Sequence, residues 1–315
     1  MISCESDDDS PRFAVSVVVP HWNSGRMLLD QLEALAPQVL AEHGEIIVVD
    51  DHSDDGTPHA VAAWADRRPE VPLTLLCADH RFGVNTSRNV GVAYARSAVV
   101  AFADGDDVVE EGWLCALLRR VEPGVIVSGR VLADGASAPE SPGEFFGFGW
   151  TFAFGGSMAL ERDLVLAVDG FDENIHRGGT EVEFCLRAQL FASARVVVAP
   201  DAVVLYHVRE QERMPRLRRR VQRQRGHAYI ARKFRSHPQV TAGVLGFRHP
   251  LARIPRQFVR DLRRNPSAAL GNVLLDLLLA CWVVRFRISM PVERLGGSSG
   301  RHTIVVRSGP GEMRP

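Results

Sequence analysis

The alternation of β-branched runs with stretches of helical periodicity constrains this chain more than any other feature. The runs at 13–20 (FAVSVVVP) and 45–50 (EIIVVD) are almost continuously apolar, which is typical of strands buried on both faces. Between them, apolar residues recur at helical spacing at Leu28, Leu32, Leu35 and Val39. Strands that alternate with helices predict an α/β fold, in which a mostly parallel sheet is flanked by helices on both faces.

The same pattern continues along the chain. Further strands are expected at 73–77, 98–103 and 195–199, and further helices at 57–67, 85–96, 112–119 and 181–191. Ligands of such sheets bind beyond the carboxyl ends of the strands. Polar clusters stand at three of those ends, namely HWN at 21–23, DDHS at 50–53 and DGDD at 104–107. The sequence therefore predicts a functional site along this edge of the sheet.

Charge is distributed unevenly along the chain. The whole chain has a formal net charge of −1, yet residues 209–264 contain 17 basic and 3 acidic residues. An acidic body with a basic tail suggests that the tail meets phosphate, lipid or nucleic acid. Every basic residue except Lys233 is an arginine, which we interpret mainly as codon bias of the genome.

The cysteines and the amino-terminal residues indicate in which cellular compartment the protein is located. The five cysteines are widely spaced and include no C-x-x-C pair, which argues against a disulfide framework or a zinc site and favours a reducing compartment. Residues 1–12 (MISCESDDDSPR) are acidic and polar, unlike a signal peptide. We therefore expect a disordered lead-in at 1–12 and a cytoplasmic protein, located at the inner face of the membrane if its basic tail binds lipid.

Three carboxylates, those of Asp104, Asp106 and Asp107, stand within four residues after an apolar strand. Such carboxylates repel one another unless a cation binds, and their hard oxygen atoms suit Mg²⁺ or Mn²⁺ held against a diphosphate. The alternative is a simple acidic turn, because Asp and Gly are ordinary turn formers.

A second acidic run, DDHSDDGT at 50–57, follows the strand at 45–50. A carboxylate at the end of a strand, such as that of Asp50 or Asp51, can accept a hydrogen bond from an N–H group of a nucleobase. The alternative is that Asp55 or Thr57 only caps the next helix. We expect both roles, with the cap carried by the later residues of the run.

Six segments, in order, resemble motifs of the family 2 glycosyltransferases, from about residue 13 to residue 207. VSVVVPHWN is similar to the opening strand of that family, and EIIVVDDHSDDGT to its nucleotide-binding segment. FGVNTSRNVGVAYA resembles its R-N-x-G helix, and FADGDD its D-x-D metal motif. GGSMALERDLVLAVDGFDE and GGTEVEFCLRA resemble its last two motifs. The resemblance implies a glycosyltransferase domain of the GT-A type at 13–207, which moves a sugar from a nucleotide-diphosphate sugar to an acceptor hydroxyl.

The resemblance also implies a role for each matching residue. The contacts to the nucleotide-sugar would come from Pro20, Asn23, Asp50, Asp51, Arg88, Asp104, Gly155 and Gly156. Asp106 would ligate Mn²⁺ or Mg²⁺, with His207 as a further ligand. Asp172 would lie on the acceptor side, and Glu181 would be the general base. A UDP-sugar is the default donor, with dTDP and GDP left open; a single base predicts inversion of the anomeric carbon, and the acceptor is unknown.

The chain departs from the family pattern at the expected base. Thr180 and Glu181 stand where the family commonly has Glu-Asp, and the alignment of Phe184 and Arg187 places Glu181 at the catalytic Asp. Glu is one methylene longer than Asp, so the geometry must be adjusted elsewhere. Glu183 is the rival candidate, and positions two apart on a helix point in different directions.

Residues 208–295 are expected to form a helical, basic extension and 296–315 a loose tail. Arginines recur at helical spacing between 253 and 263, opposite an apolar face, which suits an anionic membrane surface. The alternative is a solvated face on a helix that packs against the body. The apolar stretch 268–284 is shorter than the ~20 residues of a membrane span, so we expect a buried or homodimer-forming helix there. Nucleic-acid binding is not expected, because the basic segment lacks interleaved aromatic residues.

Two other functions are alternatives to glycosyl transfer. One is a sugar nucleotidyltransferase, although no glycine-rich basic segment that grips a triphosphate precedes HWN at 21–23. The other is a non-catalytic carbohydrate-binding or scaffold protein of the GT-A type, against which the intact acidic triplet and Glu181 argue. A dehydrogenase is excluded more firmly, because no G-x-G-x-x-G follows the first strand.

Overall fold

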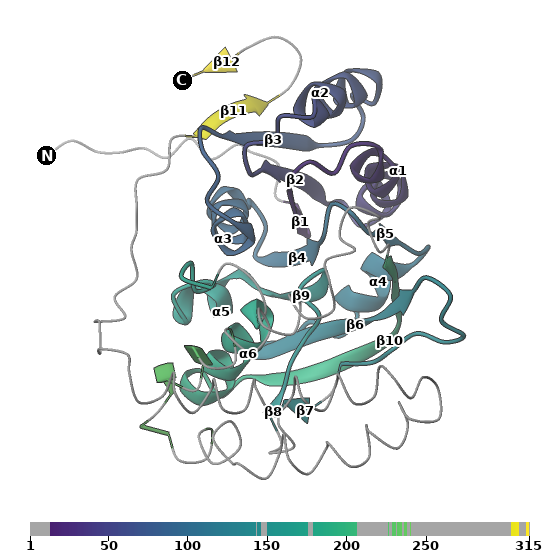
Figure 1. Ribbon diagram of the computed structural model, residues 1–315. Helices are drawn as coiled ribbons and strands as arrows, with labels where there is room; N and C mark the ends of the chain where they lie inside the picture. Colours follow the sequence, from purple (N-terminus) through teal and green to yellow (C-terminus); the bar gives the residue numbers. More distant parts are fainter. Residues whose placement is uncertain are drawn as a thin grey trace, which may run out of the picture.

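The computed structural model describes most of the predicted domain and a few residues of the extension. The described residues are 13–142, 144–145, 150–175, 179–206, 226, 229–230, 232–234, 236–237, 240, 304–308 and 313–314. They form a ten-stranded sheet with helices on both faces and a small second sheet of β7 (Glu144–Phe145) and β8 (Trp150–Thr151) (Figure 1). The expected lead-in at 1–12, the expected metal ligand His207, and the segments 253–263 and 268–284 lie outside the described residues.

Four parallel strands form the half of the sheet that carries the polar clusters. Across the sheet they are β3 (Leu73–Ala78), β2 (Glu45–Asp50), β1 (Ser16–His21) and β4 (Val99–Ala103). Every residue of β1 and β2 is buried, because helices cover both faces, and this explains their nearly continuous apolar sequence. The predicted parallel strand–helix units are confirmed in this half of the sheet.

The other half of the sheet is mixed rather than parallel. Strand β9 (Ser157–Glu161) runs antiparallel to both of its neighbours, β4 and β6 (Val125–Ala133). Strand β10 (Arg195–Tyr206) pairs parallel with β6 and antiparallel with β5 (Val108–Val109). Because β9 is antiparallel, its first residue pairs with the last residue of β4, which brings the segment just before β9 to the acidic cluster at 104–107.

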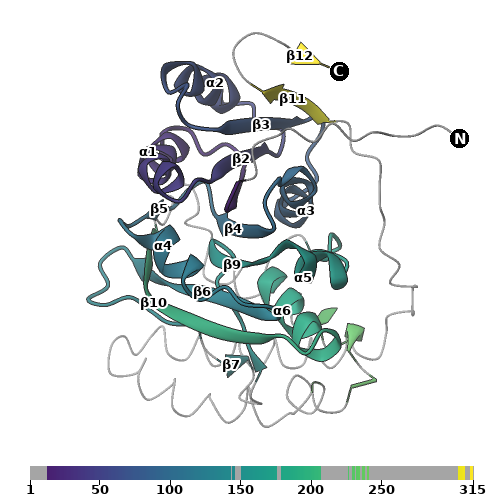
Figure 2. The same cartoon turned by 180° about the vertical axis from the view of Figure 1, so that it is seen from behind.

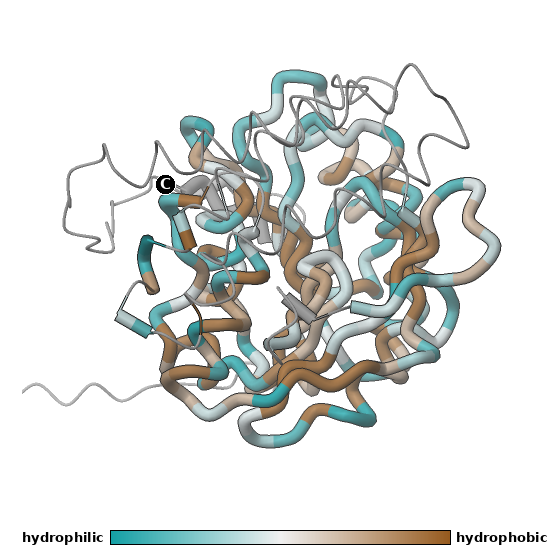
Figure 3. Tube along the Cα trace, turned by 60° about the horizontal axis from the view of Figure 1, so that its bottom comes forward, coloured by the Kyte–Doolittle hydropathy of each residue, from teal (hydrophilic) through white to brown (hydrophobic). Residues whose placement is uncertain are grey.

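Alternate side chains of β1 face two separate layers of helices. Val17 and Val19 belong to a core shared with α1 (Arg26–Ala41), α2 (Thr57–Arg67) and α4 (Trp113–Leu118). Val18 belongs to a core shared with α3 (Val84–Tyr94), α5 (Arg162–Ala167) and α6 (Thr180–Phe191). The two groups of helices lie on opposite sides of the sheet (Figure 2), and the strands between them are hydrophobic (Figure 3).

The carboxyl-terminal residues add two features to this domain. Strand β11 (Ile304–Ser308) pairs antiparallel with β3, and β12 (Met313–Arg314) pairs with β11, so the segment expected to be a loose tail supplies strands at one edge of the sheet. Within the extension, Ile230 and Phe234 are buried against α6. Among the described residues, no helix is long and apolar enough to cross a membrane.

Candidate functional site

The carboxyl ends of β1 and β2 are tied together by hydrogen bonds. The parallel register sets His21 beside Asp50, and His21 Nε2 lies 3.3 Å from Asp50 Oδ1. Just beyond, Asn23 Nδ2 donates to Asp54 Oδ1 at 2.7 Å, and the Asp54 N–H donates back to Asn23 Oδ1 at 3.0 Å. Burial raises the pKa of Asp50, although hydrogen bonds from Ser53 act in the opposite direction. The first two polar clusters of the sequence therefore form one hydrogen-bonded unit.

Asp51 is buried and binds the loop that leads into α3. Its carboxylate accepts hydrogen bonds from the N–H groups of Phe82 at 2.7 Å and Gly83 at 3.0 Å. Arg81 Nε lies 3.6 Å from Asp51 Oδ2, and the guanidinium carbon of Arg81 lies 3.4 Å from the centroid of the Trp22 ring. A cation–π pair of this kind brings a positive charge and an aromatic surface to the same corner as Asp51.

An ion pair between a buried arginine and a partly exposed aspartate lies at the carboxyl end of β4. Arg88 of α3 donates from Nη2 to Asp104 Oδ1 at 2.9 Å, and the Arg88 side chain is 4% exposed. A Cβ atom added to Gly155 would lie 2.7 Å from Arg88 Nη2, and one added to Gly156 would lie 2.6 Å from Asp104 Oδ2. Only glycine allows the backbone to approach this pair so closely. The four residues that the sequence assigned separately are thus brought together.

Arg88 also has unused hydrogen-bonding capacity. Its Nε and Nη1 atoms are buried and have no hydrogen-bond partner in the described part of the chain. A buried donor that lacks a partner costs about 1–3 kcal/mol, and more for a charged group. Arg88 therefore binds Asp104 through one nitrogen and keeps two buried donor nitrogens without a partner among the described residues, beside the partly exposed carboxylate of Asp104.

The acidic cluster offers a partial metal site. Asp106 is partly exposed and Asp107 is buried, both directly after Asp104. Among the described residues, no three His, Cys, Asp or Glu side chains gather closely enough to hold an ion by themselves. Mg²⁺ typically takes one or two protein carboxylates and completes its shell with water and substrate phosphates. The residues at the end of β4 fit a cation of that kind and do not fit a closed, all-protein site.

Helix α3 fixes the turn that precedes α6. Asn89 Oδ1 accepts from the Phe171 N–H at 2.7 Å, and Asn89 Nδ2 donates to the Phe171 carbonyl at 2.9 Å. One turn earlier, Asn85 Nδ2 donates to the Asp172 carbonyl at 2.7 Å. The helix that carries Arg88 therefore also positions Asp172.

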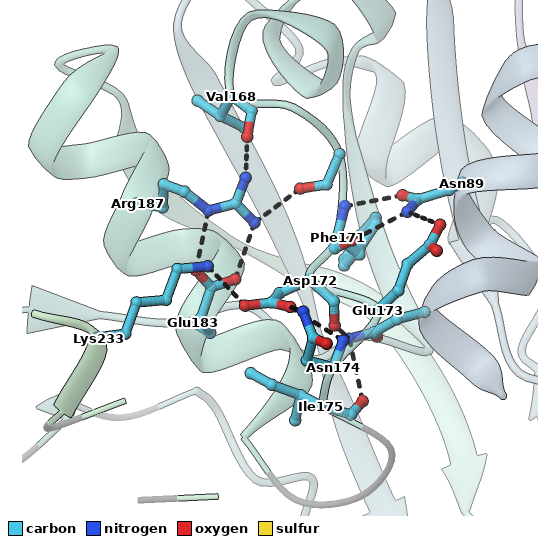
Figure 4. Close-up of polar contacts among 12 residues, drawn as sticks. Asn89, Val168, Phe171, Asp172, Glu173, Asn174, Ile175, Glu183, Arg187 and Lys233 are labelled. Carbon is cyan, nitrogen blue, oxygen red and sulfur yellow. Dashed lines mark hydrogen bonds and ion pairs between the residues drawn. The ribbon is translucent and has the colours of Figure 1, made fainter. Parts of the chain in front are cut away.

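Asp172 is held by the carboxyl-terminal extension (Figure 4). Its Oδ2 atom accepts from Lys233 Nζ at 2.6 Å and from the Tyr229 hydroxyl at 2.8 Å. Burial alone would raise the pKa of Asp172, but the hydrogen bond and charge of Lys233 outweigh it and lower the pKa to about 2. The same environment, led by burial, raises the pKa of Tyr229. At neutral pH Asp172 is a charged, fully engaged carboxylate and a poor proton acceptor.

The two rival carboxylates of α6 lie in different environments. Glu183 is fully buried, and its carboxylate contacts Arg187 Nη2 at 2.8 Å and Lys233 Nζ at 2.8 Å. Glu181 is partly exposed in the first turn of the helix and accepts a hydrogen bond from the Thr180 hydroxyl. The geometry favours Glu181 as the carboxylate that a substrate hydroxyl can reach.

Sequence reasoning missed Lys233 and Tyr229. Lys233 is the only lysine in the chain, and a rare residue type carries no functional signal by itself where codon bias explains its rarity. Its partner Asp172 is 61 residues away in the sequence, and no local pattern links the two. Arg81, which stacks on Trp22, was likewise not singled out.

Comparisons with known proteins identify the family. Residues 16–168 match the family model described as glycosyl transferase family 2. The succinoglycan biosynthesis protein ExoO of Rhizobium meliloti is 29% identical over 222 residues, which are 62% of this chain and 61% of that protein. The glycosyltransferase AglE of Haloferax volcanii is 24% identical over 311 residues, 93% of this chain and 97% of that protein. The chain thus spans less than two thirds of the length of ExoO.

Solved structures share the fold. The mannosyltransferase PcManGT from Pyrobaculum calidifontis, in complex with GDP-Man and Mn²⁺, superposes with a TM-score of 0.62 at 18% identity and covers 90% of this chain and 89% of that one. Residues 1–349 of S. aureus TarS, in complex with UDP-GlcNAc, give a TM-score of 0.57 at 20% identity, with 87% of each chain covered. The shared architecture shows a GT-A fold, and from the family match residues 16–168 of this chain belong to glycosyl transferase family 2.

Proposed function

We propose that this protein transfers a sugar from a nucleoside-diphosphate sugar to an acceptor hydroxyl, with inversion and with Mn²⁺ or Mg²⁺. The observation that carries the proposal is the ion pair between buried Arg88 and partly exposed Asp104, against which Gly155 and Gly156 pack. Donor groups of Arg88 remain without partners in the described part of the chain, and the backbone of the two glycines packs directly against the pair. A polar, anionic donor substrate supplies the missing partners.

The donor is assigned to the carboxyl ends of β1, β2 and β4. Pro20, Asn23, Asp50 and Asp51 would surround the nucleobase, since the first two strand ends form one hydrogen-bonded unit. Asp104 would bind the ribose, and the backbone of Gly155 and Gly156 would lie against the donor sugar. The ligands bound in the structural neighbours, GDP-Man and UDP-GlcNAc, support a nucleotide-sugar and leave its base open.

Asp106 is the proposed protein ligand of the cation. It lies after Asp104 and is partly exposed, whereas Asp107 is buried. A bound divalent cation would stabilise the negative charge that develops on the departing diphosphate. His207 stays a proposed further ligand and lies outside the described residues.

Glu181 is the proposed general base. The acceptor oxygen forms a bond to the anomeric carbon as the bond from that carbon to the diphosphate breaks, and Glu181 takes the hydroxyl proton. A single base and direct displacement invert the anomeric configuration. Thr180 compensates for the longer side chain of Glu, because its hydroxyl bonds one carboxylate oxygen and fixes the direction of the other. Asp172 borders this acceptor side through its position in the preceding turn.

A donor screen tests the proposal. The full chain is incubated with UDP-, GDP- and dTDP-sugars and Mn²⁺, and released nucleoside diphosphate is measured; water serves as a slow acceptor when no other is supplied. We expect release from donors of one base, lost on chelation of the metal. Consumption of a nucleoside triphosphate with release of pyrophosphate would identify a nucleotidyltransferase instead. Tight nucleotide binding without turnover for any donor and acceptor would identify a binding protein.

A further inference from the structure

Lys233 bridges two carboxylates that lie on different segments. Its Nζ atom is 2.6 Å from Asp172 Oδ2 and 2.8 Å from Glu183 Oε1 (Figure 4). Asp172 belongs to the turn before α6, and Glu183 belongs to the first turn of α6, two residues after Glu181. One ammonium group therefore joins the two segments on either side of the proposed base.

Arg187 cannot replace Lys233 in this arrangement. Its guanidinium donates twice to Glu183, at 2.8 Å from both Nε and Nη2. Its other donors are directed to the backbone carbonyls of Val168 and Gly170. The Asp172 side chain is only 6% exposed and receives its positive partner from Lys233 alone among the described residues. Without Lys233, two buried carboxylates would share the single charge of Arg187, which is unfavourable at low dielectric.

The remaining contacts of Asp172 are also structural. Its Oδ1 atom accepts from the N–H and the Nδ2 of Asn174, both at 3.0 Å. Its Oδ2 atom is shared by Lys233 and the Tyr229 hydroxyl. Both oxygens are thus engaged by protein groups, so Asp172 acts as an anchor for the turn.

Apolar contacts deliver Lys233 to this position. Ile230 and Phe234 of the extension pack against Val182 and Leu186 on α6, and both are almost fully buried. Tyr229 and Lys233 are four residues apart and therefore share one face of a helical stretch. Hydrophobic contacts attach the extension to α6. The ammonium group of Lys233 then fixes the position of α6 relative to the preceding turn, because it binds a carboxylate on each.

We propose that Lys233 is a positioning residue for the transfer reaction: by joining Asp172 to Glu183, it holds the start of α6, and with it Glu181, in the catalytic arrangement. Tyr229 and Lys233 of the extension are then part of the acceptor half of the site. This inference rests on the proposed role of Glu181 as the base. The bridge itself is independent of that role and is tested separately.

The first test uses the fact that the chain has one lysine. The native full chain is treated with an amine-acylating reagent, and modification of Lys233 is followed by peptide mass spectrometry against the urea-unfolded chain. We expect acylation at least tenfold slower in the native protein and several-fold faster in Asp172→Asn than in wild type. Equal rates in native and unfolded chains would overturn the bridge, whatever the enzyme transfers.

The second test separates positioning from mere stability. Lys233→Met keeps the aliphatic stem and removes the charge, and we expect kcat to fall at least tenfold while the Kd for the donor nucleotide changes less than twofold. Lys233→Arg should restore kcat to within about threefold of wild type. Lys233→Met/Asp172→Asn restores charge balance and should recover thermal stability but not kcat. Recovery of both in this double variant would overturn the positioning role.

The two tests distinguish failure of the proposed function from failure of the proposed role of Lys233. If wild type releases no diphosphate from any donor, the proposed function fails while slow acylation of Lys233 still supports the bridge. If wild type is active and Lys233→Met matches it in kcat, the positioning role fails while the proposed function stands.

Discussion

The donor half of the site and the acceptor half are held together in different ways. The donor half consists of neighbouring parallel strand ends, where hydrogen bonds join consecutive loops, as between Asn23 and Asp54. The acceptor half consists of a turn, the start of α6 and a distant extension, joined by ion pairs between Asp172, Glu183, Arg187 and Lys233. The donor half also contains an ion pair, between Arg88 of α3 and Asp104, but the parallel register of the sheet already places its strand ends side by side. The segments of the acceptor half lie outside the sheet and are joined by a network of charges.

This difference predicts a division of labour. Substitutions at the strand ends should act on donor and metal binding, and substitutions around α6 should act on the chemical step.

Asp106→Ala should abolish metal-dependent turnover. The variant removes the partly exposed carboxylate at the end of β4, the proposed ligand of the cation. The measurement is release of nucleoside diphosphate across a Mn²⁺ titration. Asp66→Ala, at an exposed position on α2, is the matched control and should behave as wild type. Near-normal rates for Asp106→Ala would show that Asp106 is not a ligand of the catalytic metal.

Glu181→Gln should lower turnover by a factor on the order of 10²–10⁴, the usual contribution of a general base. Gln keeps the shape of the side chain and its contact with Thr180 but does not accept a proton at neutral pH. Single-turnover rates would measure the loss. Glu111→Gln makes the same chemical change at an exposed position and serves as the control. Full activity of Glu181→Gln would place the base elsewhere.

Glu183→Gln is not a suitable control, although the helix positions alone suggest a mild effect. The structure shows Glu183 fully buried between Arg187 and Lys233. Removal of one partner of a buried ion pair costs about 3–5 kcal/mol. Reduced activity in this variant would therefore need to be read together with its unfolding free energy.

Asp51→Ala should weaken nucleotide binding by about tenfold or more, because hydrogen bonds to a charged group contribute about 1.5–3 kcal/mol. The carboxylate also orders the loop at Phe82 and Gly83, which adds to the loss. Calorimetry with the nucleoside diphosphate measures the affinity, and kcat at saturating donor should change much less. Unchanged affinity would exclude Asp51 from the nucleotide site.

Asp172→Asn should make the unfolding free energy depend less on pH in the acid range than it does in wild type. The folded-state pKa of about 2 lies below the ordinary value of 3.8, so the ionised carboxyl stabilises the fold above about pH 4, and this contribution is lost as the pH falls toward 2. The difference corresponds to about 2 kcal/mol. Urea unfolding of both proteins between pH 7 and pH 3 would show about half of this difference, since the remainder is lost only below pH 3. Parallel pH profiles for wild type and variant would contradict the assignment.

The donor half was largely predictable from the sequence. The run EIIVVD predicted β2 with its observed bounds, and the polar clusters after β1, β2 and β4 do meet at one edge. This was possible because parallel strands buried on both faces leave a continuous apolar signal, and their order fixes which ends are neighbours. The reversal at β9, which brings Gly155 and Gly156 to Asp104, was not visible in that signal.

The acceptor half was predictable only in part. Helix α6 and the choice of Glu181 over Glu183 followed from motif spacing, and the buried ion pairs of Glu183 agree with that choice. The contacts of Lys233 and the pairing of β11 with β3 join residues far apart in the chain. Interactions of this kind produce no periodic pattern in the sequence, because the two residues or strands that pair are separated by many other residues.

The separation of the two halves is tested most directly by calorimetric titration of the donor nucleotide with Mn²⁺ into wild type and Glu181→Gln. The donor contacts are assigned to the carboxyl ends of β1, β2 and β4, to Arg88 of α3 and to Gly155 and Gly156 before β9, and none of them comes from α6. We therefore predict that the two Kd values agree within about twofold, while turnover differs by at least about 10². A Kd that rises in proportion to the loss of turnover would contradict the account, because Glu181 would then contribute to donor binding rather than to proton transfer.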